Sequence, residues 1–241
     1  MVHLPRVIGI VGGLTWEATA LYYDRLNRLS NARLRLQQPD SAHTVRILVD
    51  SLDFGEIEKL ANREDWPAIG RMLRASAQRL EHAGAACVLL AANTAHLQAD
   101  MVRAGIRVPL IHVADALAAG AAAGKVRRVA ILGTRFVARG TLFDAALSAH
   151  GIAVAAPDDA TVERIDRMIF DDLARGRFTP EVRSAARKLV EALPEQGFDA
   201  AALCCTELPV LLRGESFGLP VFDTVELHVR AALDFALEGI A

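Results

Sequence analysis

Short, almost continuously apolar runs alternate along the chain with longer stretches in which apolar side chains recur at helical spacing. Val7–Val11, Ala86–Ala91 and Ala200–Leu203 are runs of the first kind. They predict strands buried on both faces, as in parallel sheets covered by helices. Trp16–Leu29 is a stretch of the second kind, with apolar residues three and four positions apart, and predicts an amphipathic helix. We therefore expect an α/β fold.

The strand and turn signals occur twice. Val7–Gly13 is similar to Val129–Thr134, and Cys87–Thr94 is similar to Ala200–Glu207. In each half the second motif follows the first after roughly 70 to 80 residues, which indicates an internal repeat. The sequence therefore predicts two similar, pseudo-symmetric halves, each a parallel sheet covered by helices on both faces.

The expected domains are residues 1–105 plus 215–241 for the first half and 106–214 for the second. The final helix is expected to return to the first half. Open α/β sheets bind ligands at the carboxyl ends of their strands. We expect the active site in the cleft between the two halves.

Composition narrows the choice of partners. The chain has 241 residues, 52% of them hydrophobic, and a net charge of −2, which argues against nucleic acid or a membrane surface as the main partner. The longest run without a charged residue or a histidine, 83–95, is too short to span a bilayer, and the N-terminus lacks the pattern of a secretory leader. Three cysteines, two of them adjacent, make no sensible disulfide framework. We expect a cytoplasmic protein.

One cysteine stands where a strand gives way to a helical stretch. Cys205 follows the predicted strand and precedes Leu208–Leu212. A thiol at a helix N-terminus meets unpaired N–H groups and the positive end of the helix dipole, so we expect a lowered Cys205 pKa. Cys204 is expected to point into the sheet layer, and Glu207 either orients Cys205 or complements the dipole.

The other turns carry weaker signals. Gly12-Gly13 lacks the third glycine of a dinucleotide loop, and we interpret it as a backbone nest for a small carboxylate or as a plain tight turn. Asn93 or Thr94 is expected to cap the following helix. His96 is expected either to pack structurally or to touch substrate. The histidines and cysteines show no metal-ligand spacing, so no metal is predicted.

Taken together, these motifs are collinear with those of a known family. They are Gly9–Thr19, Ser51–Phe54, Asn93–His96, Leu132–Arg135, Cys205–Glu207 and Phe222–Thr224. The chain resembles the aspartate/glutamate racemase family over nearly its whole length, and its Trp16-Glu17 loop is most similar to the broad-specificity amino-acid racemase branch.

The resemblance implies a racemase that uses no cofactor, PLP included, and acts on a small acidic amino acid to give the D-isomer. In that family one thiolate removes the Cα proton while a second thiol supplies a proton from the opposite face. The resemblance also suggests a homodimer. Carried over to this sequence, Cys205 is one base. The expected substrate contacts are Asn93, Thr94 and Thr206, with Gly13, Ser51 and Thr134 as carboxylate or amine contacts.

Two positions depart from the family pattern. The first catalytic thiol falls on Ala92, which can neither accept nor donate a proton. A lysine expected to reach the distal carboxylate falls on Ala174, so His43 is a substitute candidate for that contact.

The missing thiol leaves several interpretations open. Water, Thr94 or His96 serves the opposite face, or the chain is a one-cysteine decarboxylase or isomerase of the same superfamily. A catalytically silent carboxylate-binding homologue and an engineered alanine are the remaining alternatives.

Overall fold

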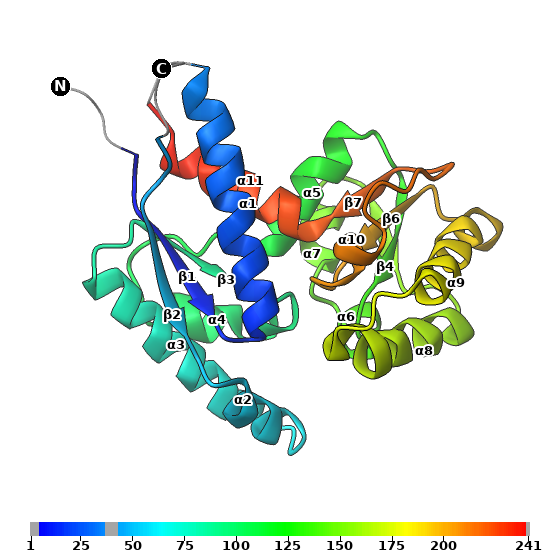
Figure 1. Ribbon diagram of the computed structural model, residues 1–241, viewed down its shortest axis with the longest axis horizontal. Coiled ribbons are helices and arrows are strands. Elements are labelled where there is room, and N and C mark those ends of the chain that lie inside the picture. Colours follow the sequence, from blue (N-terminus) through cyan, green and yellow to red (C-terminus); the bar gives the residue numbers. More distant parts are fainter. Residues whose placement is uncertain (1–4, 37–42, 240–241) are drawn as a thin grey trace. The chain divides into compact units, whose positions relative to one another are not determined.

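The chain folds as two compact α/β units, each with one parallel sheet flanked by helices, as the sequence predicts (Figure 1). The computed structural model describes residues 5–36 and 43–239. Unit 1 contains the described residues up to His112 and those from His228 onward, and unit 2 is Val113–Leu227. Residues 1–4, part of the N-terminus in which no leader pattern was expected, lie outside the described residues.

The unit boundaries lie at 112/113 and 227/228 rather than at 105/106 and 214/215. Strand pairing explains both shifts. Leu110 forms a parallel bridge with Val88, which keeps the segment before it in unit 1. Val221 pairs with Ala201, which keeps the segment before the last helix in unit 2.

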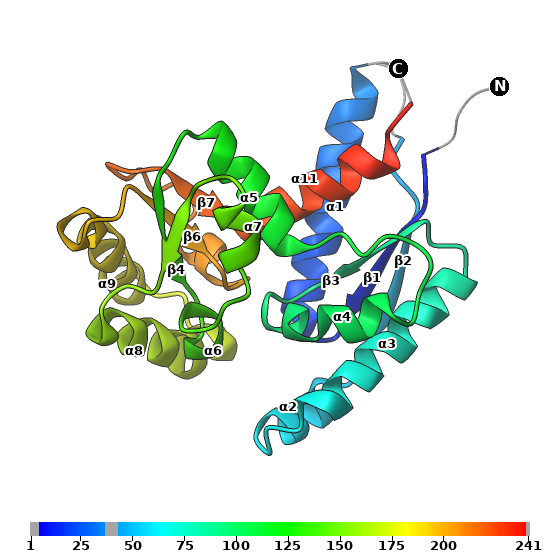
Figure 2. The same ribbon diagram turned by 180° about the vertical axis from the view of Figure 1, so that it is seen from behind.

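Unit 1 is built on a three-stranded parallel sheet in the order β2-β1-β3. Ile8 and Ile10 of β1 are fully buried on one face, and Val11 is fully buried on the other, where it packs with Leu73. Figures 1 and 2, which view the molecule from opposite sides, show α1 on one face of this sheet and α3 on the other. The elements up to the first unit boundary are β1 (Ile8–Gly12), α1 (Trp16–Arg35), β2 (Ile47–Ser51), α2 (Phe54–Ala61), α3 (Trp66–His82), β3 (Cys87–Leu90), the 3-10 helix η1 (Thr94–Gln98) and α4 (Ala99–Arg103).

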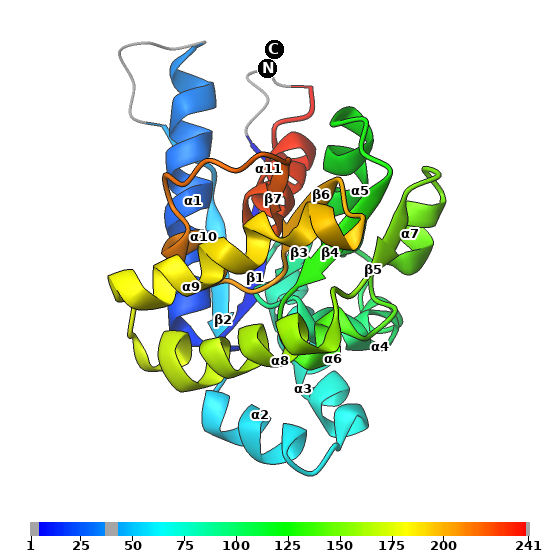
Figure 3. The same cartoon turned by 90° about the vertical axis from the view of Figure 1, so that its right-hand side faces the viewer.

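Unit 2 has a four-stranded parallel sheet in the order β5-β4-β6-β7. Its central strands alternate strictly: Ala201 and Leu203 face one apolar cluster, whereas Ala200 and Ala202 face the other. Figure 3 shows α8 and α9 on one side of β4 and β6, and α5 and α7 on the other. The elements are α5 (Val113–Ala123), β4 (Arg128–Leu132), α6 (Arg135–Ala138), α7 (Asp144–Ser148), β5 (Ala153–Ala155), α8 (Asp159–Arg167), the π-helix η2 (Met168–Asp172), the 3-10 helices η3 (Leu173–Arg175) and η4 (Leu193–Gln196), α9 (Pro180–Glu191), β6 (Ala200–Leu203), α10 (Leu208–Leu211) and β7 (Val221–Asp223). The last helix, α11 (Thr224–Ala236), begins in unit 2 and belongs to unit 1 from His228 onward.

The two sheets have the same internal order. In unit 1 the order is β2-β1-β3, and the bridge at Leu110 lies next to β3. In unit 2 the order is β5-β4-β6, and β7 lies next to β6. The first strand of each half therefore lies between the second and third, and a fourth segment flanks the third. This shared order is the pseudo-symmetry that the repeated motifs predict.

Candidate active site

In unit 2 two of the predicted site residues lie at one sheet edge. β4 and β6 are neighbours, with Leu132 paired to Leu203, and the turns that contain Thr134 and Cys205 follow these paired residues directly. The two turns touch, since a Cβ built on Gly133 would lie 2.9 Å from the carbonyl oxygen of Cys204. The carboxyl edge of this sheet thus carries both the turn with Thr134 and the turn with Cys205.

The two adjacent cysteines pack on opposite faces of the unit 2 sheet. Cys204 is 2% exposed and belongs to the apolar cluster shared with α5 and α7, whereas Cys205 belongs to the cluster on the opposite face. The sheet alternation thus directs Cys204 into the packed layer, as the sequence predicts.

Cys205 is hydrogen-bonded to the acid two residues later. Its thiol donates to Oε2 of Glu207 at 2.8 Å, and the Thr206 hydroxyl donates to the same oxygen at 2.7 Å. Both bonds come from residues adjacent in sequence, so the turn itself fixes the arrangement. A thiol whose proton already points at a carboxylate has an acceptor for that proton within the site.

The expected lowering of the Cys205 pKa is wrong for this structure. Burial of the thiol raises its pKa well above the ordinary value, and the charge and hydrogen bond of Glu207 raise it further, against smaller lowering effects of the Glu207 and Leu208 amides. The helix that was to supply the dipole, α10, is only Leu208–Leu211. The resting form is therefore the thiol.

Thr134 contributes a hydroxyl that the described part of the chain leaves unsatisfied. Its Oγ1 is buried without a hydrogen-bond partner there, while its carbonyl accepts from the amides of Val137 and Ala138. A buried hydroxyl lacking a partner is costly to folding and is a feature that functional sites retain. Its side chain is free to bond a ligand at this edge.

Unit 1 presents the equivalent edge. Gly12 pairs with Ser51, and the Ala91 amide donates to the Val11 carbonyl at 3.0 Å. Gly13, Ser51 and Ala92 therefore end neighbouring strands at the carboxyl edge of the unit 1 sheet. Ala92 is half-buried, and its methyl group carries no proton to exchange.

Gly13 does not offer its own amide to the expected anion nest, because that amide is engaged within the fold. Gly13 N–H donates to Oγ1 of Thr19 at 2.8 Å, and that hydroxyl donates to the Thr15 carbonyl at 2.9 Å. Gly13 has a φ of +73°, and a Cβ there would lie 1.9 Å from the Leu52 carbonyl oxygen. The tight-turn interpretation of Gly12-Gly13 therefore fits the structure.

The segment after β3 also differs from expectation. Asn93 precedes the 3-10 helix η1 but makes no side-chain cap bond to it, and Thr94 lies inside that helix. The Asn93 side chain is buried, and Thr94 is half-buried.

His96 is a buried neutral group rather than an exposed one. It is 3% exposed, and its Nδ1 lies 3.0 Å from the carbonyl oxygen of Ala92. Burial, with smaller effects of His228 and His112, holds its pKa well below the usual value. His96 thus packs beneath the turn that contains Ala92.

Two further candidates lie away from these edges. His43 precedes β2 and is exposed, whereas Ser51 ends that strand, so His43 belongs to the opposite, amino edge of the sheet. Ala174, the position of the family lysine, is exposed in η3. Cys87 begins β3 and is fully buried, and burial raises its pKa to about 12.

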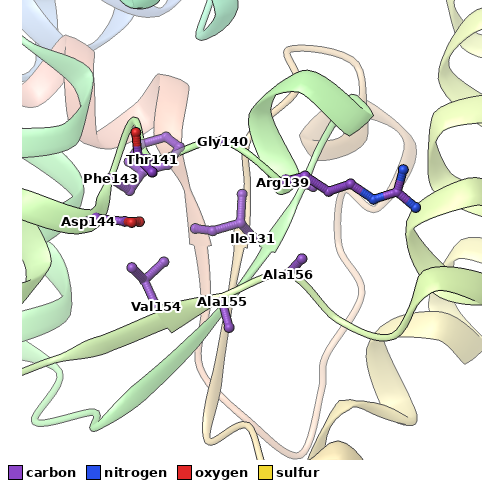
Figure 4. A pocket seen from close by; sticks show the side chains of 10 residues that line it. Ile131, Arg139, Gly140, Thr141, Phe143, Asp144, Val154, Ala155 and Ala156 are labelled. Carbon is purple, nitrogen blue, oxygen red and sulfur yellow. The ribbon is translucent and has the colours of Figure 1, made fainter.

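A cavity of about 330 Å³ lies in unit 2 beside β5. Figure 4 shows Ile131 in the middle of the lining residues, with the Arg139 side chain extending away from the others. Arg139 is bound to Asp159 and Glu163 at 2.9 and 3.0 Å. No predicted site residue is among the described residues that line this cavity, so it does not enlarge the site.

Within residues 5–36 and 43–239, no histidine, cysteine or acid cluster is arranged to hold a metal ion. In the same ranges no helix has the length and apolar character needed to cross a bilayer.

Comparison with known proteins identifies the family. The sequence pattern of the Asp/Glu/hydantoin racemase family matches residues 11–232. The chain belongs to this family. A crystal structure of a candidate Asp/Glu racemase from Yersinia pestis is similar over 97% of this chain and 100% of its own, with 34% identity and a TM-score of 0.87. An aspartate racemase homologue from Pyrococcus horikoshii OT3 has 30% identity, the same coverage and a TM-score of 0.80.

More distant members of the racemase family share the fold. A glutamate racemase from Francisella tularensis, solved with D-glutamate, has 13% identity and a TM-score of 0.66 over 98% of this chain and 82% of its own. Membership of the racemase family supports a racemase-type activity for this chain.

The structure adds residues that the sequence patterns did not single out. Thr19 satisfies the Gly13 amide, and Tyr22 binds His228 within unit 1. Thr15 and Thr19 face each other across one helical turn, a spacing visible in the sequence. The pairing of Tyr22 with His228, 206 residues apart, has no local signal.

Proposed function

We propose that this chain is a cofactor-independent amino-acid racemase of the aspartate/glutamate type in which Cys205 exchanges the Cα proton. The 2.8 Å hydrogen bond from the Cys205 thiol to Glu207 is the observation that carries the proposal. The thiol is the acid–base group, and Glu207 can accept its proton even though the pKa of Cys205 is raised.

The proposed sequence of proton transfers begins at that hydrogen bond. Glu207 takes the thiol proton, and the Cys205 thiolate then removes the Cα proton of a bound amino acid, whose C–H electron pair passes into the carboxylate as an enediolate. When the Cys205 thiol returns the proton to Cα, transfer from Glu207 back to sulfur restores the starting state without inversion. When a water on the opposite face supplies the proton, Cys205 keeps the proton taken from Cα, and the Glu207 proton neutralises the hydroxide, which completes inversion. Hydrogen-bond donors on the carboxylate lower the barrier because negative charge accumulates there in the transition state.

Substrate contacts are proposed for hydroxyl and amide groups near the strand ends. Thr134 supports such a role because its buried hydroxyl has no partner among the described residues. Thr206 is half-buried and shares Glu207 with Cys205, which places it beside the reacting sulfur. Asn93, Thr94 and Ser51 are proposed contacts from unit 1. A homodimer in the cytoplasm is part of the same proposal.

Ala92 favours a second candidate, the one-cysteine chemistry of a decarboxylase or isomerase. Because alanine has no exchangeable proton, inversion needs a donor other than this side chain. A carbanion protonated by Cys205 alone keeps its configuration. The unaltered chain is therefore expected to exchange Cα–H faster than it inverts the stereocentre.

Cα–H exchange tests both candidates. L- and D-aspartate and glutamate are incubated with the chain in D₂O, and deuterium uptake and chirality are followed together. Cys205→Ala is expected to reduce exchange by at least roughly 10²-fold, the usual contribution of one acid–base group. Ala92→Cys is expected to raise the ratio of inversion to exchange.

The controls separate the alternatives. Cys204→Ala, a change in the packed layer, is expected to leave the exchange rate per folded molecule nearly unchanged. Exchange that persists in Cys205→Ala would contradict the assignment of the base. Absence of exchange with every substrate, in a chain that binds them, would identify a silent carboxylate-binding homologue.

A further inference from the structure

Unit 1 contains a buried line of ring side chains to which the proposed chemistry gives no part. Tyr22 is 1% exposed, His96 3% and His228 0%. The ring centroids of Tyr22 and His228 lie 5.6 Å apart, and those of His228 and His96 lie 5.2 Å apart, both edge to face. His112 packs edge to face on the His96 ring as well, at 4.8 Å. The line therefore runs from α1 through α11 to the segment after β3.

The partners of His228 fix its protonation. Its Nε2 lies 2.8 Å from the Ile111 carbonyl oxygen, which can only accept, so Nε2 carries the hydrogen. Its Nδ1 lies 2.9 Å from the Tyr22 hydroxyl, which donates to it. Burial lowers the His228 pKa to about 4, so the neutral ring with Nε2–H is the form present near pH 7.

His96 has the opposite tautomer. Its Nδ1 must donate to the Ala92 carbonyl, because that oxygen has no hydrogen to give. Since the ring is neutral, Nε2 is a bare acceptor, and it has no hydrogen-bond partner among the described residues. The unsatisfied nitrogen is the cost of holding the ring in this orientation.

The hydrogen bond from His96 to the Ala92 carbonyl sets the direction of the Asn93 amide. A trans peptide is planar, so the N–H of Asn93 points opposite to the Ala92 carbonyl. His96 pulls that carbonyl toward the histidines and therefore turns the Asn93 N–H away from them. The orientation of this peptide thus depends on the His96 ring.

His228 also lies at a boundary of the unit. It is the first residue of unit 1 after the chain returns from unit 2, and Ile111 lies just before the chain leaves at His112. The 2.8 Å bond between them joins the two crossing points. The His228 ring thus contacts both the Ile111 carbonyl and the His96 ring.

We propose that His228 and His96 are positioning residues for the Ala92–Thr94 turn, with His228 holding the His96 ring and His96 fixing the peptide between Ala92 and Asn93. This proposal rests on the proposed function only for its effect on the rate. In the proposed function, groups of this turn contact the substrate carboxylate, where charge develops in the transition state, so their orientation affects the rate more than substrate binding.

Nuclear magnetic resonance tests the arrangement without substrate. Nitrogen-15 shifts of histidine rings distinguish the two neutral tautomers. At pH 7 we expect His96 as the Nδ1–H form and His228 as the Nε2–H form. Finding His96 as the Nε2–H form, or as a cation, in the unaltered chain would overturn the proposal.

Paired substitutions test the link to the turn. His96→Asn places an amide donor where Nδ1 was, whereas His96→Gln places it farther along the side chain. We expect His96→Asn to keep the Asn93 amide resonance, and His96→Gln and His228→Gln to shift it. Tyr22→Phe leaves the hydrogen bond between His228 and Ile111 in place and is expected to move the Asn93 amide resonance least.

Kinetics completes the test. His96→Gln is expected to lower kcat for Cα–H exchange by roughly 10- to 100-fold with little change in KM, and His96→Asn to restore most of that loss. Equal kcat in folded His96→Asn and His96→Gln would overturn the proposal. Absence of exchange in the unaltered chain, with the tautomers and the Asn93 response as expected, would contradict the proposed function and leave the positioning intact.

Discussion

Glu207 affects the thiol proton of Cys205 in two opposite ways. Burial and the negative charge of Glu207 hold the thiol proton in place, while the same carboxylate is the group that can accept it. Cys205 is therefore a thiol at rest, and it becomes a thiolate when its proton moves to Glu207. This arrangement protects the sulfur from solution electrophiles and keeps it available to a bound substrate.

Glu207→Gln separates these two effects. Removing the carboxylate charge removes a cause of the raised Cys205 pKa, so alkylation of Cys205 by iodoacetamide is expected to begin at lower pH. The rate of Cα–H exchange is expected to fall, because the proton acceptor is lost. Mass spectrometry of Cys205 across pH measures the first effect.

Thr206→Val serves as the control because it removes a hydrogen bond to Glu207 but keeps the charge. It is expected to leave the alkylation profile near that of the unaltered chain. An unchanged profile in Glu207→Gln would mean that the carboxylate charge does not reach the sulfur.

Among the elements, the turn after β1 depends most strictly on its residues. Gly13 combines a positive φ, an amide bound to Thr19 and a Cα pressed against Leu52. These constraints hold the end of β1 against the residue that follows β2. The turn fixes the edge on which Ser51 lies.

Gly13→Ala is therefore expected to destabilise the protein by roughly 3 kcal/mol or more, through steric overlap added to left-handed strain. Gly84 also has a positive φ, +96°, but a Cβ there meets nothing within 4 Å. Gly84→Ala should cost only about 1 kcal/mol, the strain alone. Urea unfolding curves measure both. Equal losses would contradict the role of Leu52.

Sequence patterns predicted the main strands and the helical stretch that is α10, but not the 3-10 geometry of the segment after β3. The strands β1, β3, β4 and β6 follow from apolar runs. The helices after β3 and β6 are 3-10 or single-turn elements, too short for periodicity to define. The direction of the Cys205 pKa depended on burial, a tertiary quantity that no local pattern carries.

At the scale of the molecule, buried neutral histidines couple stability to pH. His228 has a pKa near 4 when folded against about 6.5 when unfolded, and the pKa of His96 is shifted in the same direction. Between these values the unfolded chain binds a proton that the folded chain does not. Stability is therefore fully present above pH 6.5 and falls as the pH drops toward 4.

The expected loss from His228 alone is about 3 kcal/mol across that window. Urea unfolding at pH 7 and pH 5 should show the decrease, and His228→Gln should have a shallower dependence. An identical pH dependence in His228→Gln would show that another group controls it. The sequence could not have revealed this coupling, because Tyr22, His96 and His228 meet only in the folded unit.

The discontinuity of unit 1 has a consequence for synthesis on the ribosome. Unit 2 is one uninterrupted segment, whereas unit 1 needs Val229 and Leu233, both fully buried, and the bond from the Arg6 amide to the Ala236 carbonyl. Domains generally fold as their residues emerge. The half that is translated first must therefore wait for the last helix, and the half that is translated second is completed first.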